Sequence, residues 1–186
     1  MNIIFSKKLV LQQYKQQKSQ QIFTRILMNV LAVFLMSISL KAAALDIGQL
    51  APDFTLKSTQ GENLNLTEQR GQIIVINFWA SWCGPCRKEM PILESLHSKY
   101  NSLGVSVWGV NVEQENQAGK DFLADLNLSF PIFFDSSNKI AADYQVEAMP
   151  TTVIIDRNGQ VRHVFRGYKD GYEKKYAKAI KSLVRE

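Results

Sequence analysis

The stretch FWASWCGPCRKEMP, residues 78–91, contains Cys83 and Cys86, the only two cysteines of this 186-residue chain. A pair of cysteines separated by two residues is a redox arrangement when it lies next to a β-α-β pattern. The sequence on either side of residues 78–91 shows whether such a pattern is present.

Two near-continuous apolar runs flank the cysteines. Residues 72–79 (QIIVINFW) and 105–112 (VSVWGVNV) each predict a strand that is covered on both faces. Between them, Met90, Leu93 and Leu96 recur at a helical spacing. The sequence therefore predicts a parallel strand–helix–strand unit, with the cysteines at the junction between the first strand and the helix.

The rest of the sequence continues as an α/β domain. Asn158-Gly159 separates two apolar runs and predicts a hairpin turn, because Asn-Gly tolerates positive φ. We therefore expect a mixed central sheet flanked by helices, with an extra N-terminal β-hairpin. The further expected elements are this hairpin within 51–68, helices near 118–126, 140–144 and 171–184, and strands at 130–134, 151–156 and 161–167.

Residues 1–44 differ from the rest in composition. They contain six Lys or Arg and no acidic residue, with an apolar run at 26–40. This order, with Ala42 and Ala44 at the end, predicts a signal peptide cleaved near Ala44. The apolar run is shorter than the ~20 residues of a comfortable membrane span, but a membrane anchor formed by residues 26–40 is the alternative. In either case residues 45–186 form the exported domain, in the periplasm or another extracytoplasmic compartment.

The net charge of +5 comes from this N-terminal segment. The remaining residues hold 16 Lys and Arg against 17 Asp and Glu, which gives a net charge of −1. The basic pI of about 9.2 thus reflects targeting, and no nucleic-acid partner is expected. The lysines between 174 and 181 predict a solvated helix face.

The expected position of the cysteines indicates their chemistry. Cys83 should lie at the helix N-terminus, where free N–H groups and the helix dipole stabilise a thiolate. Cys86, one turn further along, should be less exposed. A structural zinc site needs four ligands, and His97 lies about 16 Å along the helix from Cys86. We therefore expect neither a metal nor another cofactor.

Four stretches of the sequence resemble a known family. FWASWCGPC and MPTTVIID are similar to the motifs of the thioredoxin superfamily. APDFTL and GVNVEQENQAGKDFL are similar to its exported TlpA/ResA-type branch of thiol–disulfide oxidoreductases. The resemblance implies a thioredoxin-like fold for residues 45–186 and a cis peptide between Met149 and Pro150, opposite the cysteines. It also implies that Trp82, Met149 and Pro150 border the substrate.

An activity and partners follow from this resemblance. Cys83 would attack a substrate disulfide, and Cys86 would then release the reduced substrate. We expect a monomeric reductase of disulfides in exported proteins, with apocytochrome c as one substrate, recharged by a membrane thiol reductase. A general dithiol oxidase or isomerase is the alternative, because the sequence does not fix the reduction potential.

One position departs from thioredoxin itself. Thioredoxin carries an acid on the central strand where this chain has Asn77, which cannot exchange a proton; the TlpA-type branch commonly has Asn there. Another acid would therefore assist Cys86. The candidates for proton transfer are Glu89, one turn after Cys86, and Glu113 and Glu115, in the loop after the second apolar run.

Two other functions fit the sequence less well. APDF also opens many peroxide reductases, but their Pro-x-x-x-Thr-x-x-Cys pattern precedes neither cysteine. A copper-delivery protein would need a wider cysteine spacing and a suitably placed histidine. His163 lies next to the Asn-Gly turn, and we expect it to be a core or surface residue rather than a metal ligand.

Overall fold

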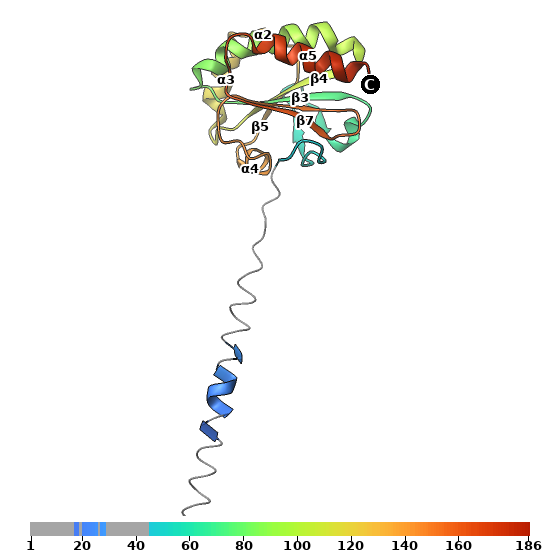
Figure 1. Cartoon of the computed structure of the whole chain (residues 1–186). Coiled ribbons are helices and arrows are strands. Elements are labelled where there is room, and N and C mark those ends of the chain that lie inside the picture. The colour runs from blue at the N-terminus through green and yellow to red at the C-terminus, as the bar shows by residue number, and fades with distance from the viewer. Residues whose placement is uncertain (1–16, 19, 26, 29–44) are drawn as a thin grey trace, which may run out of the picture. The chain divides into compact units, whose positions relative to one another are not determined.

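The computed structural model describes residues 17–18, 20–25, 27–28 and 45–186 (Figure 1). The chain divides into two units, residues 1–42 and 43–186, and the described residues of the first unit are helical. Of the expected signal peptide, residues 1–44, the structure describes residues 17–18, 20–25 and 27–28. The cleavage site near Ala44 and, apart from residues 27–28, the alternative anchor at 26–40 lie outside the described residues. Within the described part, no helix is both long enough and apolar enough to cross a membrane.

Residues 45–186 form an α/β domain. Its strands are β1 (Thr55–Lys57), β2 (Asn63–Asn65), β3 (Ile73–Trp79), β4 (Val105–Asn111), β5 (Ile132–Phe134), β6 (Thr151–Ile155) and β7 (Val161–Arg166). Its α-helices are α2 (Gly84–Tyr100), α3 (Asn116–Ala124), α4 (Lys139–Asp143) and α5 (Tyr172–Val184). Two 3₁₀ helices, η1 (Thr67–Gln69) and η2 (Asn101–Leu103), complete the domain.

The central sheet is mixed, as the sequence predicts. Its strand order is β5-β4-β3-β6-β7. β3, β4 and β5 run parallel, whereas β6 and β7 are antiparallel to their neighbours. The predicted strand–helix–strand unit is therefore confirmed as β3-α2-β4. β1 and β2 pair antiparallel and form the expected N-terminal hairpin.

The predicted turn between the last two strands is also confirmed. Gly159 has a φ of 79°, a left-handed conformation that glycine adopts without steric cost. The N–H of Gly159 donates to the carbonyl of Asp156 at 2.9 Å, which closes the turn. This turn allows β7 to return along β6 and to form one edge of the sheet.

β3 lies in the middle of the sheet, and all seven of its residues are buried. Val75 and Trp79 pack in the core cluster that includes side chains of α2 and α5. Ile76 and Phe78 pack in a second cluster, on the α4 side. Successive side chains of a strand point to opposite faces, so Asn77 lies on the same face as α2. Figure 1 shows α2 and α5 on one face of the sheet and α4 on the other.

Candidate active site

The cysteines lie where the sequence predicts, between the end of β3 and the start of α2. Cys83 is the N-cap residue of α2, and Pro85 lies in the first turn of this helix. The backbone N–H of Cys86 donates to Sγ of Cys83 at 3.1 Å. Since the first N–H groups of a helix have no partner within the helix, this bond and the helix dipole favour a negative charge on the Cys83 sulfur.

Cys83 and Cys86 are joined by a disulfide with an S–S distance of 2.05 Å. Cys83 is 4% exposed and Cys86 is 0% exposed. The order of exposure agrees with the prediction, although the difference is small in the disulfide form. Because Cys86 is closed to solvent, the sulfur that an incoming sulfur atom can approach is that of Cys83.

The structure gives the conformation and the exposure of the residues expected to border a substrate. The Met149–Pro150 peptide bond is cis, as the resemblance implies. Met149 is half-buried and packs against the core cluster that contains both cysteines. Trp82, directly before Cys83, is 71% exposed. Substrate binding by Trp82, Met149 and Pro150 remains a prediction.

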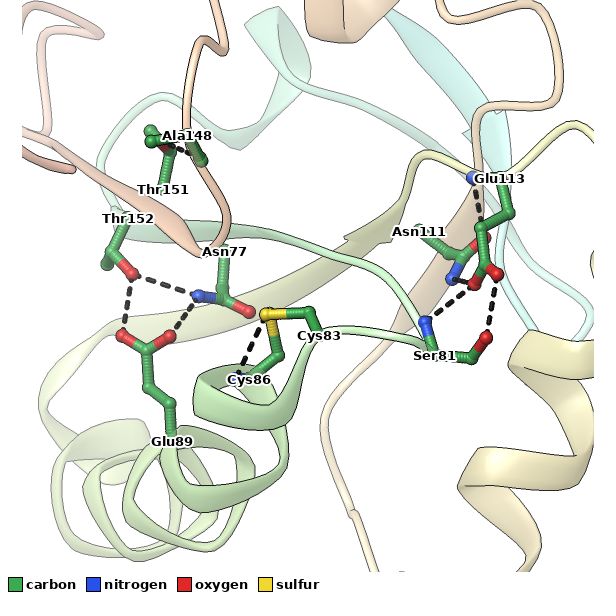
Figure 2. The surroundings of a disulfide bond; sticks show 10 residues. All are labelled: Asn77, Ser81, Cys83, Cys86, Glu89, Asn111, Glu113, Ala148, Thr151 and Thr152. Atoms are coloured by element: carbon green, nitrogen blue, oxygen red, sulfur yellow. Dashed lines mark hydrogen bonds between the residues drawn. A yellow bond between two sulfur atoms is a disulfide. The ribbon is translucent and has the colours of Figure 1, made fainter. Parts of the chain in front are cut away.

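A buried polar network lies beside the disulfide (Figure 2). Nδ2 of Asn77 donates to Oε2 of Glu89 at 2.8 Å and to Oγ1 of Thr152 at 2.9 Å. Oε1 of Glu89 accepts from the Thr152 hydroxyl at 3.0 Å and from the Tyr176 hydroxyl at 2.5 Å. Of the three glutamates expected to transfer protons, Glu89 is the one that binds Asn77, which lies next to the cysteine pair in Figure 2.

Burial controls the acidity of Glu89. The residue is 0% exposed, and burial raises the pKa of its carboxyl group. The hydrogen bonds from Tyr176, Thr152 and Asn77 act in the opposite direction and offset only part of this effect. Glu89 is therefore a more basic carboxylate than an exposed glutamate, and it lies one helical turn after Cys86.

Glu113 holds the loop that leads to Cys83. Its Oε2 accepts from the backbone N–H of Ser81 at 2.7 Å and from Nδ2 of Asn111 at 2.8 Å, and its Oε1 accepts from the Ser81 hydroxyl at 2.7 Å. Partial burial acts to raise the pKa of Glu113, but these hydrogen bonds outweigh it and lower the pKa. Figure 2 shows Glu113 on the far side of Ser81 from Cys86.

Glu115 is not part of either hydrogen-bond network. It is exposed and is the N-cap residue of α3, where its side chain makes no capping hydrogen bond. The structure thus buries Glu89 in the polar network around Asn77, ties Glu113 to the loop before Cys83, and leaves Glu115 at the surface.

The histidines lie in ordinary structural positions. Nδ1 of His97 accepts the backbone N–H of Val107 at 3.3 Å, and His163 stacks on Phe165. Among the residues described by the structure, no group of three or more His, Cys, Asp or Glu side chains could hold a metal ion.

The sequence alone did not identify four polar partners of these glutamates. Thr152 and Tyr176 complete the surroundings of Glu89, and Ser81 and Asn111 bind Glu113. Thr152 follows Pro150 in MPTTVIID, which is a local signal for its position. Tyr176 carries no such signal, because its apolar ring matches the pattern of an ordinary core residue of α5.

Together, the mixed sheet, the Cys-x-x-Cys disulfide at the N-terminus of α2 and the adjacent cis-proline define a thioredoxin-like thiol–disulfide protein. The model of the AhpC/TSA family matches residues 47–164. The chain belongs to this family and is a thiol–disulfide oxidoreductase of the ResA/DsbE type.

Individual relatives support this assignment. The thiol-disulfide oxidoreductase ResA of Geobacillus kaustophilus is 36% identical over 124 residues, which cover 67% of this chain and 71% of the relative. The thioredoxin-like protein YneN of Bacillus subtilis is 39% identical over 131 residues, covering 69% and 76%. The crystal structure of a Chlorobium tepidum protein assigned as the thiol:disulfide interchange protein DsbE superposes with a TM-score of 0.73 at 33% identity, covering 76% of this chain and 99% of that one.

Proposed function

We propose that this chain is an exported protein-disulfide reductase that works through the Cys83–Cys86 dithiol. The observation that carries the proposal is that the two sulfur atoms have different surroundings. Sγ of Cys83 accepts the N–H of Cys86 at the start of α2, whereas Cys86 is fully buried. This asymmetry supports Cys83 as the nucleophile and Cys86 as the residue that resolves the mixed disulfide.

The proposed cycle starts from the dithiol. The Cys83 thiolate attacks one sulfur of a substrate disulfide, and the other substrate sulfur leaves and takes up a proton. Cys86 then loses its proton and attacks Sγ of Cys83, which releases the second substrate thiol and forms the Cys83–Cys86 disulfide. The substrate gains two electrons and two protons. Both electrons come from the two cysteines, one proton comes from Cys86, and the other comes from solvent, because Cys83 starts as a thiolate.

Glu89 is the proposed acceptor of the Cys86 proton. It follows Cys86 by one turn of α2, and burial raises the pKa of its carboxyl group. A base in such a position typically accelerates a proton-transfer step by about 10²–10⁴-fold. Glu113 is less suited to this role, because its hydrogen bonds lower the pKa of its carboxyl group and it lies on the far side of Ser81 from Cys86 (Figure 2). The contacts of Glu115 do not link it to the cysteines.

The proposed substrates are disulfide-bonded proteins outside the cytoplasm. The exposed ring of Trp82 and the half-buried Met149 offer an apolar surface for a peptide around a disulfide. Apocytochrome c is one candidate substrate, implied by the resemblance to the TlpA/ResA-type branch. In this proposal a membrane thiol reductase recharges the dithiol of a monomeric enzyme, which is either released by cleavage near Ala44 or anchored by residues 26–40.

Trapping the mixed disulfide tests both the chemistry and the substrate class. A Cys86→Ala variant keeps the nucleophile but cannot resolve the intermediate, so it should accumulate covalent complexes with exported proteins. Mass spectrometry of these complexes should find the substrate linked to Cys83. Cys83→Ala is the matched control and should capture nothing. The proposal is wrong if the reduced parent protein does not reduce protein disulfides and the Cys86→Ala variant captures no partner.

Two assays on the reduced protein address the other activities. Consumption of hydrogen peroxide at a catalytic rate would favour a peroxide reductase. Tight stoichiometric binding of Cu(I) by the two thiols would favour copper delivery. We expect neither result.

A further inference from the structure

One buried acceptor beside the disulfide has no hydrogen-bond donor. Asn77 is 0% exposed, and its Oδ1 atom makes no hydrogen bond. Buried polar atoms in folded proteins are nearly always paired, because an unpaired one has lost its hydration without compensation. The unpaired Oδ1 of Asn77 is therefore a feature that requires a physical reason.

The orientation of the Asn77 amide is fixed by its other atom. Nδ2 directs its two hydrogens to Oε2 of Glu89 and to Oγ1 of Thr152. The Thr152 hydroxyl uses its own hydrogen for Oε1 of Glu89. If the amide were turned over, its oxygen would face the Glu89 carboxylate, and two acceptors would oppose each other. Oδ1 is thus held on the side away from Glu89.

On that side lies the disulfide. Figure 2 shows Oδ1 of Asn77 pointing toward the Cys83–Cys86 pair. The chain position agrees, because Asn77 lies on the face of β3 that carries α2 and binds Glu89, one turn after Cys86. The sulfurs of a disulfide carry no hydrogen, so neither can donate to Oδ1.

We propose that Oδ1 of Asn77 accepts a hydrogen bond from the S–H group of Cys86 once the disulfide is reduced. A donor dithiol supplies two electrons, breaks the S–S bond and itself becomes a disulfide. One of its two protons ends on the sulfur of Cys86 and the other passes to solvent, which leaves Cys83 as a thiolate. Cys83 can remain a thiolate through the N–H of Cys86, so the thiol that needs an acceptor is Cys86, which no water reaches. Asn77 is then a positioning residue that stabilises the dithiol over the disulfide.

This inference rests on the proposed dithiol chemistry and gives Asn77 and Glu89 complementary roles. Asn77 holds the proton on Cys86 in the resting dithiol, and Glu89 receives it when Cys86 attacks the mixed disulfide. Asn77 stands where thioredoxin has an acid. It would thus shift the equilibrium between the dithiol and the disulfide although it does not titrate.

Two matched variants of the full chain test the proposal. Asn77→Leu and Thr152→Val each remove one hydrogen bond to Glu89, but only Asn77→Leu removes Oδ1. Each protein is equilibrated with mixtures of reduced and oxidised dithiothreitol. We expect Asn77→Leu to move the equilibrium constant toward the protein disulfide by about 3- to 10-fold, and Thr152→Val to move it by less than about twofold. Equal shifts in both variants would overturn the proposal.

A spectroscopic measurement tests the hydrogen bond without turnover. The Cys83→Ala protein has a single S–H group, that of Cys86, whose infrared stretching band can be recorded folded and unfolded. A hydrogen bond to Oδ1 should lower the band frequency in the folded protein, and Asn77→Leu in this background should restore it. A folded band at the frequency of the unfolded protein would refute the bond. A lowered band in a protein without reductase activity would instead refute the proposed function alone.

Discussion

The hydroxyl of Tyr176 donates to Oε1 of Glu89 at 2.5 Å and connects residues 87 positions apart in the sequence. Tyr176 lies on α5 and Glu89 on α2, so the bond joins the two helices that cover one face of the sheet. Burial and the nearby Glu89 carboxylate raise the pKa of Tyr176, so that the tyrosine keeps the proton it donates. The surroundings of the proposed base thus depend on the last helix of the domain.

Replacement of Tyr176 should therefore lower the stability of the domain. Tyr176→Phe keeps the ring in the core but removes the donor, and a buried hydrogen bond to a charged group contributes about 1.5–3 kcal/mol. We expect a loss of this size in the free energy of unfolding in urea. Tyr172→Phe, on the same helix, is the control and should change stability much less, because no hydrogen bond from its hydroxyl to the Glu89 carboxylate is observed.

Loss of the proposed base should slow the enzyme in a pH-dependent manner. Glu89→Gln removes the proton acceptor at nearly constant volume, so reduction of a protein disulfide should be slower at neutral pH. The deficit should shrink as the pH rises and Cys86 ionises unaided. Equal rates for parent and variant at all pH values from neutral to alkaline would exclude Glu89 from the mechanism. Glu115→Gln is the matched surface control.

The same carboxyl group should make stability depend on pH. A group whose pKa is raised by folding holds its proton more tightly in the folded state. The stability contributed by Glu89 is therefore fully present below its ordinary value of 4.5 and is lost as the pH rises through the raised pKa. Urea unfolding should show Glu89→Gln gaining on the parent as the pH rises from below 4.5. A difference that does not change with pH would contradict this account.

Glu113 should show the opposite sign. Its pKa is lowered in the folded state, so its contribution is present above 4.5 and is lost as the pH falls through the lowered value. Glu113→Ala leaves the N–H of Ser81 without its partner and should cost about 1–3 kcal/mol of stability at neutral pH. Glu115→Ala, two residues further along, should cost almost nothing in the same unfolding experiment.

The two cysteines should differ in reactivity. In the reduced protein near neutral pH, Cys83 should be alkylated well before Cys86, because its sulfur faces the helix N-terminus and is the one within reach of solvent. Peptide mapping after a short exposure to iodoacetamide measures the order directly. Labelling of Cys86 first would reverse the proposed roles.

The state of the N-terminus follows from the composition of residues 1–44. We expect the mature protein to begin near Leu45, which intact mass and N-terminal sequencing of the protein from its native host would show. Recovery of a full-length chain exclusively from the membrane fraction would favour the anchor formed by residues 26–40.

Sequence patterns were sufficient for the parts of the fold that depend on neighbours in the chain. The apolar run of β3, the helical spacing in α2 and the Asn158-Gly159 turn each specify a local conformation, and they place Cys83 at the start of a helix. The helix expected at 118–126 instead spans Asn116–Ala124, although Leu126 packs against the core. An apolar residue just beyond a helix end continues the pattern without continuing the helix.

The surroundings of Glu89 could not be predicted in this way. Its spacing from Cys86 fits a solvated position on α2 as well as a buried one. Which of these occurs depends on Thr152, 63 residues away, and Tyr176, 87 residues away. Such contacts arise only when β6 and α5 pack against the helix, and no local periodicity encodes them.

The three donors to Glu89 come from β3, β6 and α5, and α5 lies farther along the chain than the other two elements. A chain that ends before residue 172 would retain both cysteines, the helix that carries them and the cis-proline segment, but would lack the tyrosine that completes the site. The surroundings of Glu89 are therefore complete only when α5 has packed against α2. Until α5 has docked, Glu89 lacks the hydrogen bond from Tyr176.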